Sequence, residues 1–145
     1  MYRHILIATD GSELAGKAET QGPNLARTLK ARVTVVTVSS PFPMASYWTA
    51  PAEGLAEAHE RVTTENARRI LEAAKAAASA SEVPCDTLHV KHEDAAEGIV
   101  DTAAAKGCDL IVMASHGYRG VKRVLLGSVA TKVLTHGKAP VLICR

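Results

Sequence analysis

The residues best suited to bind a ligand lie in the segment 114–128, which is rich in glycine and in basic side chains. This segment follows an uninterrupted apolar run at 110–113 and leads into a sequence typical of a helix start. Glycine lets the backbone approach an anion closely, and the free N–H groups at a helix start attract negative charge. A buried strand, a glycine-rich loop and a helix in this order predict a phosphate-binding site.

The start of the chain shows the same pattern. The apolar run at 4–9 leads into Asp10, Gly11 and Ser12, which are typical of a sharp turn before a helix. Two strand ends of this type can frame one nucleotide between them. Asp10 also has a simpler role open to it, as a cap of the first helix, and the two roles are compatible.

Several catalytic signatures are absent from the sequence. It contains no G-x-x-x-x-G-K-[ST] loop, no G-x-G-x-x-G fingerprint and no G-x-S-x-G elbow. No nucleophile stands beside a base, so we predict no catalytic residue. The residues that most resemble a metal site are His89, His92, Glu93 and Asp94. They fall at a strand end and a helix cap, where such side chains are usually solvated, so we expect no bound metal there.

Composition limits the class of protein. The chain has 145 residues, enough for one domain with a core, and 47% of them are apolar but only 3% aromatic. A net charge of +2 is too small for a nucleic-acid partner. No apolar run reaches the roughly 18 residues of a membrane span, and no signal peptide is evident. Three cysteines without metal-ligand spacing fit reduced thiols, and therefore a cytoplasmic protein.

The candidate site needs a scaffold, and the hydrophobic pattern predicts alternating strands and helices. We expect strands at 4–9, 33–38, 85–91, 110–113 and 141–144, and helices at 12–30, 51–81, 94–106 and 128–136. Ser12 should cap the first helix, and Asp94 with Glu97 should form a capping box. The pair Gly22 and Pro23 should kink the first helix or remove one of its hydrogen bonds.

This alternation predicts a single-domain α/β protein at 1–145, with a five-stranded parallel sheet and helices on both faces, as in Rossmann-like folds. Ligands bind such sheets at the carboxyl ends of strands, where the winding reverses. The first and fourth strands both end in special turns, so we place the reversal between them. The predicted strand order is 3-2-1-4-5.

Together these segments resemble the universal stress protein family along the whole chain. The matching pieces are 5–12, 35–38, 109–117, 125–129 and 140–142. In the ATP-binding branch of that family the loop reads Gly, two residues, Gly, nine residues, Gly, and then Ser or Thr. Gly117, Gly127 and Ser128 fit this pattern, whereas Ala114 stands in place of the first glycine.

The resemblance implies a site for ATP, or for AMP or ADP, with Mg²⁺ bound through the phosphates. Asp10 would hydrogen-bond the ribose, and Ala8 and Thr9 would line the adenine side. Val38 would contact adenine through its backbone.

The loop after the fourth strand would hold the rest of the nucleotide. Its implied binding residues, from the sugar to the phosphates, are Met113, Ala114, His116, Gly117, Arg119, Gly127, Ser128 and Val129. His116 is expected to order the loop rather than to catalyse. Arg119 is either a γ-phosphate ligand or a solvated side chain, and the glycines are either a phosphate cradle or simple turn formers.

Three functions remain open at this point. The resemblance favours an ATP-binding stress-response protein that senses or signals adenylate state, with slow hydrolysis at most. Ala114 favours a nucleotide-independent dimeric scaffold with an unknown protein partner. An adenylating enzyme is disfavoured because no suitable pyrophosphate loop follows the first strand.

Two further expectations concern partners. The last strand is apolar and lies at the sheet edge in the predicted order, so Val141, Leu142 and Ile143 should pair two copies into a homodimer, as the resemblance also implies. The segment with Phe42, Tyr47 and Trp48 should form a flap or partner surface, unless Trp48 staples it to the long helix.

Overall fold

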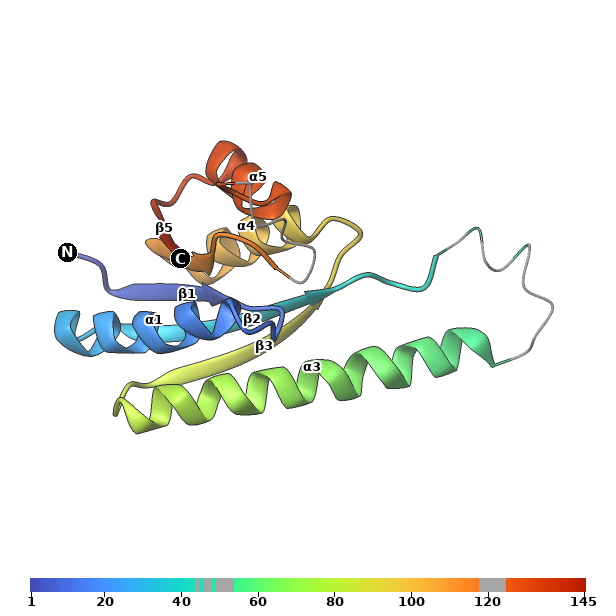
Figure 1. Cartoon of the computed structure of the whole chain (residues 1–145), viewed down its shortest axis with the longest axis horizontal. Coiled ribbons are helices and arrows are strands. Elements are labelled where there is room, and N and C mark those ends of the chain that lie inside the picture. The colour runs from blue at the N-terminus through green and yellow to red at the C-terminus, as the bar shows by residue number, and fades with distance from the viewer. Residues whose placement is uncertain (44, 46–47, 49–53, 118–124) are drawn as a thin grey trace.

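A computed structural model describes residues 1–43, 45, 48, 54–117 and 125–145. It contains one five-stranded sheet in the order β3-β2-β1-β4-β5, with every pair of neighbours parallel, as the sequence predicts. Figure 1 shows the strands and the helices that flank them. The strands are β1 (His4–Ala8), β2 (Arg32–Ser39), β3 (Cys85–Lys91), β4 (Leu110–Ala114) and β5 (Val141–Cys144). The helices are α1 (Ala15–Leu29), α3 (Leu55–Ala80), α4 (Ala95–Lys106) and α5 (Ser128–His136).

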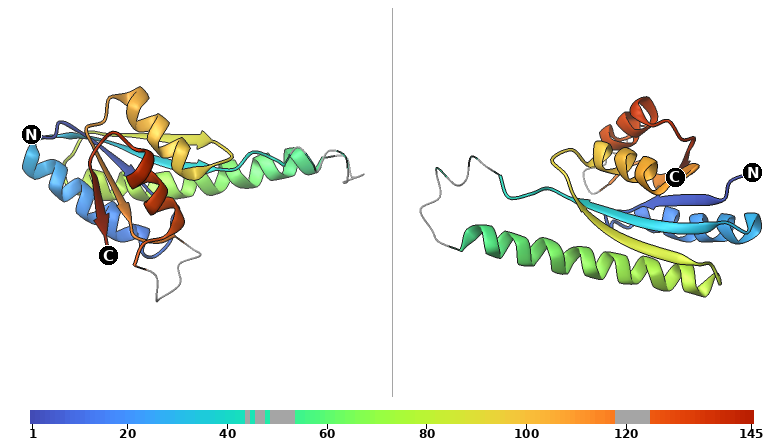
Figure 2. Two further views of the ribbon diagram at one scale, coloured as in Figure 1. Left: turned by 90° about the horizontal axis from the view of Figure 1, so that it is seen from above. Right: turned by 180° about the vertical axis from the view of Figure 1, so that it is seen from behind.

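The central strands β1, β2 and β4 are largely buried on both faces of the sheet, to which their successive side chains point in turn. Ile5 and Ile7 pack with side chains of α1 and α3 on one face. Leu6 and Ala8 pack with side chains of α4 and α5 on the other. Figures 1 and 2 show these two helical layers. Every residue of β1 and β4 is buried, so the two central strands form a rigid base for what lies at their ends.

The winding of the chain reverses between β1 and β4. From β1 the chain builds the sheet outward through β2 and β3, and it then returns to add β4 and β5 on the other side of β1. The connection that follows β1 therefore covers one face of the sheet, and the connection that follows β4 covers the opposite face. This is the point at which open parallel sheets bind ligands.

The start of α1 differs from the prediction. The helix begins at Ala15, three residues after Ser12. Ser12 nevertheless satisfies helix-start donors, because its Oγ accepts from the Ala15 N–H at 3.2 Å and its carbonyl accepts from Gly16 at 3.2 Å. The predicted kink or lost hydrogen bond at Gly22 and Pro23 falls in the interior of α1, where proline has no N–H to donate, and the helix continues past it to Leu29.

Gly22 lets α1 approach the sheet closely. A Cβ atom at this position would lie 2.5 Å from Cδ1 of Ile7 on β1. Gly22 is thus a point of close contact between α1 and the central strand β1.

The start of α4 is capped as predicted, with one change of partner. Oδ1 of Asp94 accepts from the Glu97 N–H at 3.1 Å, which is the first half of a capping box. The second half is made by His92, whose Nδ1 accepts from the Asp94 N–H at 2.9 Å. Glu97 is thereby free to bind elsewhere. The helix ends at Gly107, whose φ of 65° suits glycine.

Helix α3 begins at Leu55, later than the predicted start near residue 51. Its N-cap is Gly54, whose φ of 88° cannot continue a right-handed helix. Residues 51–53 lie outside the described part of the chain.

The aromatic residues before α3 are placed only in part. Tyr47 lies outside the described residues. Phe42 contacts the ring of His59 edge-on, with 5.6 Å between ring centroids. Trp48 is 90% exposed, so the contact with the long helix is made by Phe42 and not by Trp48. Whether the segment acts as a flap stays a prediction. Among the described residues, no helix has the length and apolarity needed to cross a bilayer.

Candidate ligand-binding site

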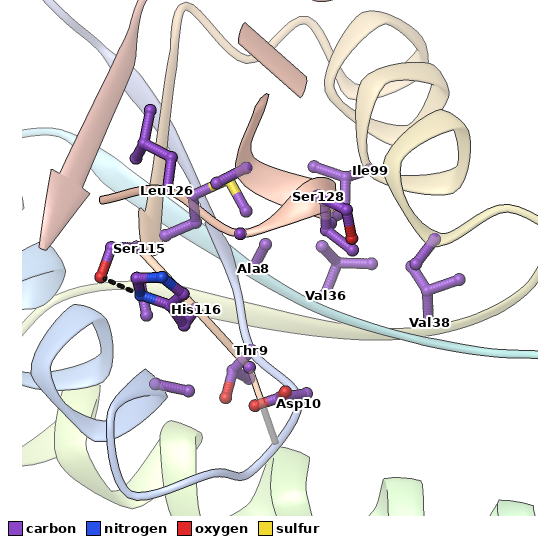
Figure 3. A pocket seen from close by; sticks show the side chains of 18 residues that line it. Ala8, Thr9, Asp10, Val36, Val38, Ile99, Ser115, His116, Leu126 and Ser128 are labelled. Carbon is purple, nitrogen blue, oxygen red and sulfur yellow. Dashed lines mark hydrogen bonds between the residues drawn. The ribbon is translucent and has the colours of Figure 1, made fainter. Parts of the chain in front are cut away.

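A cavity of about 520 Å³ opens at the carboxyl ends of β1, β2 and β4. Its size is within the range of ligand pockets, roughly 300–1,000 Å³. Figure 3 shows its side chains, which come from the ends of these strands, from the beginning of α4 and from the beginning of α5. The lining residues are Ala8, Thr9, Asp10, Ala15, Val36, Val38, Ala95, Ile99, Met113, Ala114, Ser115, His116, Gly117, Leu126, Gly127, Ser128, Val129 and Ala130.

The structure brings the sequence-predicted candidates together around this one cavity. Arg119 is the exception, because it lies outside the described residues. The others come from segments far apart in the chain, and they meet because parallel strands end at the same edge of the sheet. The structure thus shows that these residues lie at the cavity, and the role of each one stays a prediction.

The turn after β1 positions Asp10 at the cavity. The Thr9 N–H continues the sheet by donating to the Val36 carbonyl at 3.0 Å. The Thr9 hydroxyl accepts from the Gly11 N–H at 3.1 Å and donates to Glu19 on α1 at 2.5 Å. Oδ1 of Asp10 accepts from the Ser12 N–H at 2.9 Å. The Asp10 carboxylate thus closes an Asx turn at the head of the helix, and it lines the cavity as well.

The turn after β4 is closed at its base by a backbone hydrogen bond. The Gly127 N–H donates to the Ser115 carbonyl at 2.7 Å. A Cβ atom at residue 127 would lie 3.1 Å from that carbonyl oxygen and 3.4 Å from Cα of His116. Glycine is therefore the residue that fits there with least strain.

Helix α5 begins directly against the cavity. Its N-cap is Gly127, which offers no side chain to cap the first amides, and its first turn has no acidic residue. Ser128, Val129 and Ala130 line the cavity. Uncapped amides at a helix start carry partial positive charge, so this end of the cavity is suited to an anion.

Ala114 is the last residue of β4 and is buried, so β4 runs one residue further than predicted. It pairs with Cys144 of β5, and its small side chain is part of the cavity wall. The methyl group that distinguishes it from glycine lies where a ligand would approach the strand.

Part of the apolar wall of the cavity was not predicted from the sequence. Val36 and Val38 lie two residues apart on β2 and face the same side of the sheet, so the position of one could have indicated the other. Ile99 on α4 gave no such signal, because an apolar residue beside a cavity has the same pattern as one in the core. The remaining unpredicted lining residues are Ala15, Ala95, Ser115, Leu126 and Ala130.

Charged side chains join α4 to α5 beside the cavity. Lys132 on α5 pairs with Asp94 at the start of α4. This pairing lowers the pKa of Asp94 and raises the pKa of Lys132, chiefly through the hydrogen bond between them. Nδ1 of His136 lies 2.5 Å from Oε1 of Glu97. These contacts hold together the two helices whose first turns form one wall of the site.

The histidine and acid cluster considered as a metal site is divided among other partners. Nε2 of His89 lies 2.7 Å from the Ser39 hydroxyl, and burial lowers the pKa of His89. His92 and Asp94 are engaged at the cap of α4. No group of three or more metal-ligating side chains occurs within the part of the chain that the structure describes.

The fold and the cavity define an α/β protein with a pocket at the reversal point of a parallel sheet, which is where such sheets bind small ligands. The family model described as "Universal stress protein family" matches residues 1–145. The chain belongs to the universal stress protein family.

Curated relatives and a solved structure agree with this assignment. The chain is 34% identical to a universal stress protein of Methanocaldococcus jannaschii over 145 residues, covering 100% of this chain and 83% of the relative. It is 35% identical to the universal stress protein YxiE of Bacillus subtilis over 153 residues, covering 100% of both. The structure of the protein MJ0577 superposes with a TM-score of 0.83 at 30% identity, covering 99% of this chain and 96% of that one. MJ0577 is a universal stress protein of M. jannaschii.

Two more distant structures share the fold and contain adenine nucleotides. One is a universal stress protein in complex with cAMP, with a TM-score of 0.70 at 23% identity, covering 99% of this chain and 97% of that one. The other is the universal stress protein of Archaeoglobus fulgidus in complex with dAMP, with a TM-score of 0.73 at 19% identity, covering 99% of this chain and 98% of that one.

Proposed function

We propose that this protein binds an adenine nucleotide, with ATP as the principal ligand, and that it acts in the stress response by sensing or signalling adenylate state. The observation that carries the proposal is the cavity formed by the ends of β1 and β4 and the start of α5. The nucleotides found in two members of the same fold support the ligand class.

The cavity has features that suit each part of a nucleotide. Val36, Val38 and Ile99 offer an apolar surface for a base. The Asp10 carboxylate offers an acceptor for ribose hydroxyls. At the other end, the uncapped start of α5 offers amide donors to phosphate oxygens. Mg²⁺ would accompany the phosphates, because they supply the hard oxygen ligands that it prefers.

The proposal includes little or no hydrolysis. Among the described cavity residues, the side chains with the chemistry of a general base are His116 and Asp10. Nδ1 of His116 is engaged by the Ser115 hydroxyl at 3.0 Å, and Oδ1 of Asp10 accepts from the Ser12 N–H at 2.9 Å. An arrangement that holds a nucleotide without activating a water suits a sensor, in which occupancy itself is the signal.

We also propose that the protein works in the cytoplasm as a homodimer. Strand β5 is at the sheet edge, and within the described chain it pairs only with β4. Leu142 on this strand is 39% exposed. An apolar edge of this type is readily covered by a second copy of the same strand.

Two measurements test the proposed ligand. Mass spectrometry of gently denatured, freshly purified protein should release ATP, ADP or AMP. Calorimetry of nucleotide-free protein should then show micromolar binding of ATP, weakened in an Asp10→Ala variant. Protein that carries no adenine nucleotide and shows no heat with millimolar ATP would instead favour the dimeric scaffold, for which the Ala114 methyl in the cavity wall is the supporting feature.

A further inference from the structure

We propose that His116 donates a hydrogen bond from Nε2 to a phosphate oxygen of the bound nucleotide, and so distinguishes nucleotides from nucleosides. This inference rests on the proposed function, because it assigns one contact within the same cavity. It starts from an unusual feature of the ligand-free chain. The Nε2 atom of His116 is buried, and it has no hydrogen-bond partner among the described residues.

The other ring nitrogen indicates which atom carries the proton. Nδ1 of His116 lies 3.0 Å from Oγ of Ser115, and the dashed line in Figure 3 marks this contact. Ser115 is 3% exposed, so its hydroxyl hydrogen needs an acceptor within the protein. Nδ1 supplies that acceptor only when it carries no proton of its own. The neutral ring then holds its hydrogen on Nε2, which becomes a donor.

The donor lies near the anion-binding end of the cavity. A Cβ atom at Gly127 would be 3.7 Å from Cδ2 of His116, the ring carbon bonded to Nε2. Gly127 is the N-cap of α5, whose first amides have no side-chain cap. The His116 ring therefore lies beside the N-cap of α5, at the end of the cavity suited to an anion.

The energetics favour an anion over a neutral group. A buried, unpaired donor has already lost its hydration, so a hydrogen bond to it displaces no water from the nitrogen. A bond to a charged acceptor is stronger than a bond to a neutral one. The unpaired N–H destabilises the ligand-free state, and binding of a phosphate removes that cost.

The test compares two substitutions and two ligands by calorimetry. His116→Phe keeps a ring of similar size without the donor, and His116→Gln places an amide N–H near the original Nε2 position. We expect His116→Phe to weaken AMP binding by about tenfold to a hundredfold and to leave adenosine binding within about twofold. We expect His116→Gln to restore most of the AMP affinity. As a matched control, His59→Phe alters a histidine outside the cavity and should change neither affinity.

A second measurement uses the unaltered protein. In ¹⁵N spectra of the imidazole nitrogens, Nε2 of His116 should appear protonated and Nδ1 unprotonated. The Nε2 resonance should shift on addition of AMP and much less on addition of adenosine.

The outcomes separate this inference from the proposed function. If wild-type protein binds neither AMP nor adenosine, the proposed function fails and the inference fails with it. If wild type and His116→Phe bind AMP equally, only the role of His116 is overturned. The role of His116 would also be overturned if His116→Phe lost AMP affinity and adenosine affinity equally. The same holds if His116→Gln bound AMP as weakly as His116→Phe. In either case the ring would contribute through its shape and not through its N–H group.

Discussion

The carboxylate of Asp10 occupies the space that a side chain at residue 117 would need. A Cβ atom at Gly117 would lie 2.3 Å from Oδ2 of Asp10, well inside the 3.0 Å limit below which one of the groups must move. The absence of a side chain at 117 is what allows the turn after β1 and the turn after β4 to meet. The two halves of the site are therefore fitted to each other before any ligand arrives.

We predict that Gly117→Ala weakens nucleotide binding without unfolding the protein. The added methyl displaces the Asp10 carboxylate, which is the movable end of a side chain, so the backbone need not shift. The ATP affinity should fall about tenfold or more, since a misplaced acceptor forfeits a charged hydrogen bond. Calorimetry measures the affinity, and thermal unfolding should show a Tm close to that of wild type.

A matched control for this variant is Gly16→Ala in α1. A Cβ atom at Gly16 would meet no heavy atom within 4 Å. This substitution should leave the affinity unchanged and raise stability slightly, because alanine favours a helix. Unaltered ATP affinity in Gly117→Ala would contradict the assigned role of Asp10.

Gly127→Val should abolish ATP binding. The valine side chain would fill the space that the phosphates need. The structure adds a second reason, because the Cβ atom would lie 3.1 Å from the Ser115 carbonyl oxygen at the closed base of the loop. We therefore also expect a loss of unfolding free energy of roughly 1–3 kcal/mol.

Urea unfolding and calorimetry on the same preparation separate the two effects of Gly127→Val. The smaller Gly127→Ala substitution serves as the graded comparison, with intermediate losses in both measurements. Wild-type ATP affinity in a folded Gly127→Val protein would rule out the site as assigned.

Ala114→Gly should preserve the fold and either maintain or raise the ATP affinity. The removed methyl widens the cavity wall, and the change in binding free energy should be below about 1 kcal/mol. Because Ala114 lies in β4, glycine should lower the unfolding free energy by about 0.5–1 kcal/mol. A large loss of affinity would mean that the Ala114 methyl itself contacts the ligand.

Leu142→Lys should convert a dimer to a monomer or cause precipitation. The lysine places a charge on the apolar edge strand that two copies would share. Val62→Lys is the matched control, because Val62 is 69% exposed and lies on α3, which packs against β2 and β3 on the other half of the sheet. Sedimentation at tens of micromolar protein reports the assembly, and a wild-type monomer there would end the dimer proposal.

Stability should decrease on mild acidification in part because of His4. This residue is 5% exposed, and burial, aided by the charge of Arg32, lowers its pKa in the folded chain. The unfolded chain, with a histidine pKa of about 6.5, therefore binds the proton first. Well above pH 6.5, His4 makes no pH-dependent contribution to the free energy of unfolding. As the pH falls from about 6.5 towards the pKa of His4 in the folded chain, His4 lowers that free energy.

The variant that checks this is His4→Gln. Its amide can still reach Thr34, whose hydroxyl lies 2.8 Å from Nε2 of His4. Urea unfolding at pH 7.5 and pH 5.5 should show a smaller decrease in unfolding free energy for the variant than for wild type. Equal decreases in the two proteins would refute the assignment.

The positions of the strands and of the site's polar residues were predictable for a common physical reason. Buried parallel strands are continuous apolar runs, and their carboxyl ends must meet at one edge of the sheet, so Asp10 and Ser128 are expected to converge. Helix starts were less predictable. Ser12 begins a turn that becomes helical only at Ala15, and Gly54 delays α3 by its positive φ.

The apolar wall of the site could not be separated from the core in advance. Nothing in the sequence distinguishes Val36 and Ile99 from residues of the packed core. Whether an apolar residue faces a cavity depends on how much of the space beside it the other elements fill. The capping partner of Asp94 was also out of reach. Both His92 and Glu97 can serve, and the choice depends on where His136 of a different helix lies.

The hydrogen bond between the Ser115 carbonyl and the Gly127 N–H has a consequence for how this protein can change. It fixes the two ends of the intervening segment together, whatever residues that segment contains. Doubling the length of such a closed loop adds only about 0.6 kcal/mol of closure entropy. An insertion between Gly117 and Leu126 can therefore lengthen the segment while Gly127 and the start of α5 keep their positions. In evolutionary terms, the length of this connection can vary independently of the residues at its two ends, which line the cavity.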